Sequence, residues 1–175
     1  VVTTPVYDAD HVIAAQSADF DEHGPPLVLR LDRIACHRTP EVEALLFQYD
    51  VLALHGPPRH PCFYGQLERQ NREHRAWQRM LQPVTQAEVP AAAGSMRTAL
   101  NALWAGPTLD WCTAQQAWER RPRFDVDRRQ LRRDVEWQAA GLVNAGFDVL
   151  RARRLAIESQ LVQRGLLHIT RGDWC

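Results

Sequence analysis

Two short apolar runs with an amphipathic helix between them constrain the fold more than any other feature of this chain. Residues 27–31 (LVLRL) and 51–54 (VLAL) have the length and composition of buried strands. Between the runs, Thr39 and Pro40 supply an N-cap and a first helical residue, and the apolar residues that follow recur on one helix face. A strand, a helix and a second strand are typical of parallel pairing, so the sequence predicts an α/β fold.

The rest of the chain predicts helices. Residues 8–22 are expected to form one, capped by Asp8 or Asp10, and a longer helical pattern follows Gly65 and runs to about residue 81. The chain is expected to be helical from about residue 85 onward. The helices expected there are 85–104, 113–120 and 126–163, and a final apolar stretch at 166–169 is a candidate short strand.

The basic residues of the chain are all arginine. The sequence has 21 arginines, no lysine and 21 acidic residues, so its net charge is zero, which does not suggest a strongly basic nucleic-acid binder. Arginine nevertheless makes planar bidentate contacts with phosphate. Codon bias in a GC-rich genome would also explain the composition. Residues 119–133 hold seven arginines against three acids, which indicates either a DNA-binding stripe or a solvated, salt-bridged helix.

Several classes of protein are not expected. No apolar run reaches the 18 or so residues that a membrane span needs, and the first twenty residues lack the pattern of a secretory signal. The four cysteines form no C-x-x-C pair, so neither a disulfide framework nor a zinc site is expected. We therefore expect a cytoplasmic protein with no membrane partner.

Two acids occupy positions where a metal site can form. Asp32 directly follows the first apolar run, and Glu68 lies near the start of the helix after Gly65. Active sites of open α/β sheets lie at the carboxyl ends of the strands, and Mg²⁺ binds one or two carboxylates together with waters and phosphate. The alternative is two unrelated acids, because acids are also favoured near helix N-termini.

The helix that contains Glu68 also carries a basic face. Positions i, i+3, i+4, i+7 and i+11 from Glu68 share one side of this helix and hold an acid, an amide and three arginines. An acid followed by arginines suits a phosphodiester backbone that passes a bound metal. The alternative is a solvated face. The candidate DNA-binding residues are Arg69, Asn71, Arg72, Arg75 and Arg79.

These residues together resemble a known family. The stretch LVLRLD, followed by TPEVEALLFQYDVLALHGPPRHPCFYGQLERQNREHRAW, is similar to the catalytic core of the D,D-35-E transposases and retroviral-type integrases. Thirty-five residues separate Asp32 from Glu68. Residues 64–72 resemble the family's Asn-Gly-x-x-Glu-Arg-x-Asn-Arg segment, and residues 113–118 resemble its Thr-Pro-x-x-Ala-Trp segment. The resemblance covers residues 9 to about 120.

The resemblance implies a fold, an activity and a set of site residues. It implies an RNase H-like fold and Mg²⁺-dependent DNA strand cleavage and transfer by a multimer, with Asp32 as the second catalytic and metal-binding acid and Glu68 as the third. Arg75 falls where the family often has a DNA-contacting lysine. Residues 1–110 would be a partial core of parallel strands with flanking helices, and residues 111–175 an α-helical C-terminal extension.

The chain departs from the family in three places. Only 31 residues precede Asp32, so we expect the first strand and its catalytic acid to be missing by truncation, and the chain to be inactive alone. The family's Asn-Gly after the second acid is replaced by Arg33 and Ile34, which puts a cation beside the metal position. Tyr64 replaces an asparagine. A missing first strand would leave an unpaired sheet edge, so self-association is expected.

The sequence therefore supports two functional hypotheses. The first is DNA integration or transposition by an integrase-core-like chain with Mg²⁺ as cofactor and DNA as partner. The alternative is a non-catalytic DNA-binding or oligomerisation protein that uses the arginine-rich helix face. His55 and His60 are expected to be loop residues, and Trp111 and Trp174 are candidates for stacking on bases.

Overall fold

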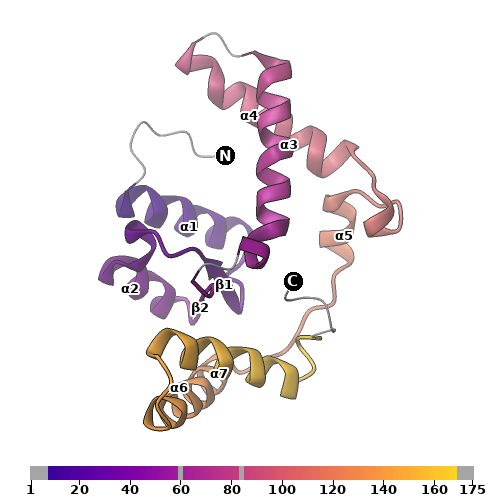
Figure 1. Ribbon diagram of the computed structural model, residues 1–175. Helices are drawn as coiled ribbons and strands as arrows, with labels where there is room; N and C mark the ends of the chain where they lie inside the picture. Colours follow the sequence, from indigo (N-terminus) through magenta and orange to yellow (C-terminus); the bar gives the residue numbers. More distant parts are fainter. Residues whose placement is uncertain (1–7, 59–60, 83–84, 169–175) are drawn as a thin grey trace. The chain divides into compact units, whose positions relative to one another are not determined.

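The computed structural model describes residues 8–58, 61–82 and 85–168 (Figure 1). Within them the fold is mixed α/β, mostly helical, with a two-stranded parallel sheet. The chain divides into two compact units. Among the described residues, the sheet unit consists of 8–58, 61–64 and 126–168, and the helical unit consists of 65–82 and 85–125.

The sheet has the strand–helix–strand order that the sequence predicts. Strands β1 (Val28–Leu31) and β2 (Leu52–His55) are parallel and pair from the first residue to the last. Helix α2 (Pro40–Gln48) connects them, and the Oγ1 of its N-cap Thr39 accepts the N–H of Val42 at 3.4 Å. Each strand begins one residue later than the sequence pattern predicts.

One face of the sheet packs against α1 (Ala9–His23) and α2. Of the two predicted caps of α1, Asp8 and Asp10, the structure has Asp8, whose carboxylate accepts the N–H of His11 at 3.1 Å. The helix ends at Gly24, which has a φ of +81°. The buried core on this face combines residues of both helices and both strands: Val12, Phe20, Leu31, Val42, Leu46, Val51 and Ala53.

The opposite face packs against α6 (Arg128–Asn144) and α7 (Val149–Gln163). Its buried core consists of Leu52, Leu54, Phe63, Leu131, Val135, Ala156 and Ile157. Successive strand residues point to opposite faces, so β2 supplies both cores, which explains why its sequence is continuously apolar. The sheet unit therefore has three layers: α1 and α2, the sheet, and α6 and α7.

The prediction of one helix over residues 126–163 is wrong. The helix is interrupted between α6 and α7. Gly146 has a φ of +93° there, and Asp148 caps α7 by accepting the N–H of Arg151 at 3.1 Å. A glycine in this conformation and a capping aspartate are standard signals for the end of one helix and the start of another. Residues 166–168 form no strand, and Ile169 lies outside the described residues.

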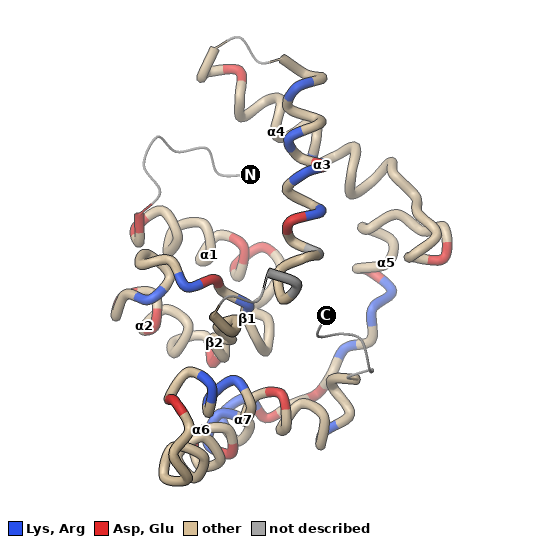
Figure 2. Tube along the Cα trace, viewed as in Figure 1, with Lys and Arg blue, Asp and Glu red and all other residues tan. Residues whose placement is uncertain are grey.

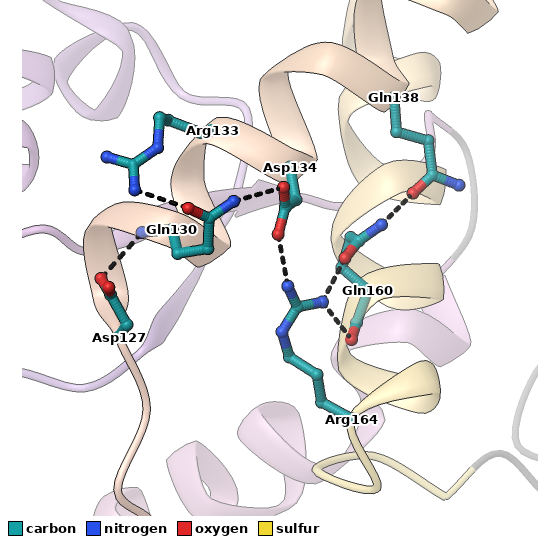
Figure 3. Close-up of polar contacts among 7 residues, drawn as sticks. All are labelled: Asp127, Gln130, Arg133, Asp134, Gln138, Gln160 and Arg164. Atoms are coloured by element: carbon teal, nitrogen blue, oxygen red, sulfur yellow. Dashed lines mark hydrogen bonds and ion pairs between the residues drawn. The ribbon is translucent and has the colours of Figure 1, made fainter.

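Side-chain contacts join α6 to α7 (Figure 3). Arg164 donates to the carboxylate of Asp134 at 2.5 Å and also to Gln160, and Gln160 donates to Gln138 at 2.8 Å. Such contacts near the surface contribute little stability individually. Together with the apolar core, these contacts stabilise the packing of α6 against α7.

The helical unit contains α3 (Gly65–Leu81), α4 (Val89–Thr98) and α5 (Ala114–Arg120). The predicted bounds of α3 and α5 are close to those observed, but the predicted helix 85–104 is a 3₁₀ turn, α4 and a π-helical turn at Ala99–Leu103. Thr113 caps α5 by a capping box. No helix in the described part of the chain is both long and apolar enough to cross a bilayer.

The two units do not follow the division at residue 110 that the family resemblance implies. Residue 110 falls inside the helical unit, and α6 and α7 belong to the sheet unit, where they cover one sheet face. Assignment of residues 1–110 to an integrase-like core stays a prediction.

Candidate functional site

Asp32 lies at the carboxyl end of β1, where ligands of parallel sheets bind. Its Oδ1 accepts the N–H of Ile34 at 3.2 Å and lies 2.6 Å from Nδ1 of His37, in the 3₁₀ turn η1 (Ala35–Arg38). The Asp32 side chain is 43% exposed and that of His37 13%. The carboxylate is therefore accessible, but one of its oxygens is already bound by a histidine that sequence reasoning did not connect with it.

His55 is the last residue of β2 and is only 8% exposed, so the expectation that it lies in a loop is wrong. Its Nδ1 lies 3.3 Å from the carbonyl oxygen of Asp32. Burial lowers the pKa of His55 below its ordinary value, and the positive charges of Arg38, Arg153 and Arg33 lower this pKa further, against the opposing effect of the hydrogen bond to Asp32. The imidazole is therefore neutral at pH 7 and lies in a positive electrostatic field.

Tyr64 joins the carboxyl ends of the two strands through its hydroxyl group. The hydroxyl accepts the N–H of Gly56 at 3.0 Å and donates to the carbonyl of Leu31 at 2.9 Å. At the start of the sheet, the N–H of Leu52 donates directly to the carbonyl of Leu27. Four residues further along both strands, the corresponding pair is Gly56 and Leu31, and the Tyr64 hydroxyl stands between them. A side chain thus replaces one backbone hydrogen bond of the ladder.

The same hydroxyl explains why residue 56 is glycine. A Cβ atom at Gly56 would lie 2.3 Å from the hydroxyl oxygen of Tyr64 and 2.7 Å from the ring of Phe63. From the sequence alone, Tyr64 stands out only as a departure from the family pattern. The sequence signal for this bridge is an aromatic residue after a glycine- and proline-rich loop. That signal does not identify Leu31, which lies 33 positions away, as a partner of the hydroxyl.

The candidate residues of α3 are exposed to solvent. Glu68 lies in the first turn of the helix, where the helix dipole favours an acid. Figure 2 shows basic residues at intervals along α3. Within the described part of the chain, no side-chain hydrogen bond or ion pair involves the members of this face, which we call the arginine face: Arg69, Asn71, Arg72, Arg75 and Arg79.

Two of the seven arginines in the basic stripe at residues 119–133 have a structural role. Arg128 donates to the carbonyls of Pro25 and Pro26 at 2.6 and 2.8 Å. Arg132 is buried and its guanidinium donates to the carbonyls of Leu46 and Val51. These two arginines therefore hold parts of the sheet unit together, and DNA contact by the rest of the stripe stays a prediction.

The proposed metal ligands lie in different units. Asp32 belongs to the sheet unit and Glu68 to the helical unit, so their pairing around one Mg²⁺ stays a prediction. Among the residues that the structure describes, no group of three or more His, Cys, Asp or Glu side chains is arranged to hold a metal ion. Two carboxylates alone are a weak Mg²⁺ site.

Comparison with known proteins identifies no relative of this chain. No protein-family model, curated protein or solved structure matches the chain. The functional proposal therefore depends on the chemistry of the residues described above and on the resemblance carried by their order in the sequence.

Proposed function

We propose that this chain functions in DNA integration, as an RNase H-like, integrase-core-like protein that binds the DNA backbone through the arginine face of α3. The observation that carries the proposal is the order of elements around two acids. Asp32 directly follows β1, a helix and a second parallel strand come next, and Glu68 lies in the first turn of α3.

The arginine face suits a phosphate backbone in both charge and length. Its arginines have no acidic partner among the described residues, so their charge is free to replace the counterions of DNA. Arg79 lies ten positions after Arg69 on the helix, a rise of about 15 Å. That length matches roughly four base-pair steps of a DNA duplex.

The two acids would supply the catalytic part of the proposal. Asp32 and Glu68 would hold Mg²⁺, which activates an attacking water or 3′-hydroxyl and stabilises the leaving oxygen. His37 already binds the Asp32 carboxylate, and Arg33 places a positive charge next to it in sequence. Both features weaken metal binding, so we expect the isolated chain to bind DNA without cutting it.

Fluorescence anisotropy with a labelled duplex, measured over a range of salt concentrations, tests the proposal. Arg75→Ala should weaken binding and reduce the slope of log affinity against log salt by about one, because one phosphate contact is lost. Arg97→Ala, an exposed arginine on α4, is the matched control and should leave the slope unchanged. Equal effects of both substitutions, or no DNA binding by the unmodified chain, would refute the proposal.

A non-catalytic DNA-binding protein is the second candidate, and the hydrogen bond between His37 and Asp32 favours it. The two candidates differ in one assay. Mg²⁺-dependent nicking of DNA that carries terminal repeats would support an active integrase core. Salt-sensitive binding without nicking under any Mg²⁺ concentration would support the second candidate.

A further inference from the structure

Residues 104–113 form a closed turn in the helical unit, between the π-helical turn and α5. An antiparallel bridge closes this turn at its two ends. Inside the bridge, the N–H of Gly106 donates to the carbonyl of Cys112 at 3.4 Å, and the N–H of Trp111 donates to the carbonyl of Gly106 at 3.0 Å. These backbone contacts hold the two sides of the turn together, so Trp104 and Trp111 belong to one compact segment, which we call the tryptophan turn.

The tryptophan turn contains two consecutive residues in the left-handed region of backbone conformation. Asp110 has a φ of +51° and Trp111 a φ of +61°. The left-handed region is unusual for a bulky aromatic residue, and residues held in it are concentrated at functional sites. Trp111 is 73% exposed, so burial of its ring does not offset the strain of this conformation.

The two indole rings of the turn lack stacking partners. Trp104 is 65% exposed, and no ring or guanidinium group among the described residues contacts the ring of Trp104 or Trp111. By contrast, Trp118 on α5 is already covered, because the guanidinium carbon of Arg121 lies 3.3 Å from the centre of its ring. The faces of both indoles in the tryptophan turn are therefore available to a ligand.

Positive charge lies beside the exposed rings. Arg120 donates from Nη1 to the thiol of Cys112 at 3.2 Å, and Cys112 directly follows Trp111. A thiol is a neutral, weak acceptor, and no described acid pairs with Arg120, so the guanidinium charge is not compensated. Residues 97–123 hold four arginines and two acids, and one of these acids, Glu119, already accepts a hydrogen bond within α5.

We propose that the tryptophan turn binds single-stranded nucleic acid, with an unpaired base stacked on Trp111 and a phosphate beside Arg120. Aromatic rings next to positive charge are the combination with which proteins bind unpaired strands, and an excess of positive charge favours a polyanion as the occupant. The proposal goes beyond binding of the duplex backbone, because it concerns bases that a duplex keeps paired. None of its residues belongs to the arginine face of α3.

Fluorescence anisotropy of the full chain with two labelled probes tests the site. One probe is a short oligothymidylate, and the other is an abasic oligonucleotide of the same length, which has the same phosphates but no bases. The unmodified chain should bind the oligothymidylate more tightly. Trp111→Ala should weaken oligothymidylate binding about tenfold and leave binding of the abasic probe unchanged. Trp137→Ala is the matched control, because Trp137 is 81% exposed but lies on α6, and it should bind both probes as the unmodified chain does.

Two further variants separate stacking and charge from a change in the shape of the turn. Trp111→Phe keeps an aromatic ring and should retain most of the affinity for the oligothymidylate that Trp111→Ala loses. Asp110→Asn removes a negative charge beside the ring, and asparagine also tolerates the left-handed region. This variant should bind the oligothymidylate more tightly, most clearly at low salt. Circular dichroism melting checks that each variant is folded.

Three results would overturn the site: no binding of the oligothymidylate, equal affinity of the unmodified chain for the two probes, or equal effects of Trp111→Ala and Trp137→Ala. Duplex DNA tests the arginine face separately, and Trp111→Ala should bind a duplex as the unmodified chain does. Failure of duplex binding together with base-dependent binding of the oligothymidylate would remove the proposed function and support this site. Duplex binding without any base-dependent binding would remove this site alone.

Discussion

At the scale of single residues, the carboxyl edge of the sheet depends on one hydroxyl group. Tyr64 satisfies the N–H of Gly56 and the carbonyl of Leu31, which would otherwise lack partners at the end of the strand pair. His55 and Asp32 occupy the same edge and are joined by a hydrogen bond from ring to backbone. These contacts link residues that are 8, 23 and 33 positions apart, so the spacing of residues within one element does not predict them.

Tyr64→Phe should destabilise the chain by about 1–3 kcal/mol, because it leaves a buried donor and a buried acceptor unpaired. Urea unfolding followed by circular dichroism measures the change. Tyr49→Phe is the matched control: its hydroxyl donates to the exposed Asp21 at 3.1 Å, and its loss should cost clearly less. Equal effects of the two substitutions would show that the Tyr64 bridge contributes nothing specific.

At the scale of elements, the sequence predicts the helices whose ends and buried faces are determined by nearby residues. Caps and apolar periodicity place α1, α2, α3 and α5 within about a turn of their observed bounds. The break between α6 and α7 was missed because Gly146 lies inside a long helical pattern, where an isolated glycine is tolerated. The docking of both helices on the sheet is a long-range contact, which periodicity alone does not encode.

Arg132 shows how α6 is attached to the sheet layer. Its guanidinium donates to the carbonyls of Leu46 and Val51, at the end of α2 and just before β2, and lies 3.5 Å from the carboxylate of Asp50. These contacts link α6 to α2 and to the segment just before β2. Arg132, a buried member of the basic stripe, therefore contributes to the stability of the fold.

Arg132→Ala should lower the free energy of unfolding by about 3 kcal/mol, the typical cost of breaking a buried ion pair. Arg129→Ala should change it little, because this neighbouring arginine also faces Asp50 but its side chain is 82% exposed against 9% for Arg132. Differential scanning calorimetry compares the two variants. A larger loss for Arg129→Ala would contradict the attachment described here.

At the scale of the whole molecule, the candidate residues are divided between two units. The sheet unit carries Asp32, and the helical unit carries Glu68 and the arginine face. The sequence order of these residues suggests the family resemblance. It could not show how the C-terminal helices complete the sheet unit, because that contact joins segments about a hundred residues apart.

The sheet predicts self-association. In the described residues β1 pairs with β2 alone, so one edge of the strand has no partner strand. Sedimentation velocity over a hundredfold range of protein concentration should therefore detect dimers at the higher concentrations. A monomer at every concentration, with a cooperative thermal transition, would contradict this expectation.

The catalytic part of the proposed function requires that Asp32 and Glu68 contribute to one divalent-metal site. Electron paramagnetic resonance with Mn²⁺ as the probe, on the full chain with duplex DNA present, tests it through a double-mutant cycle. If the acids share a site, Asp32→Asn and Glu68→Gln should each remove as much Mn²⁺ binding as the two substitutions combined. Effects that add independently, or no loss of Mn²⁺ binding in either single variant, would contradict the shared site.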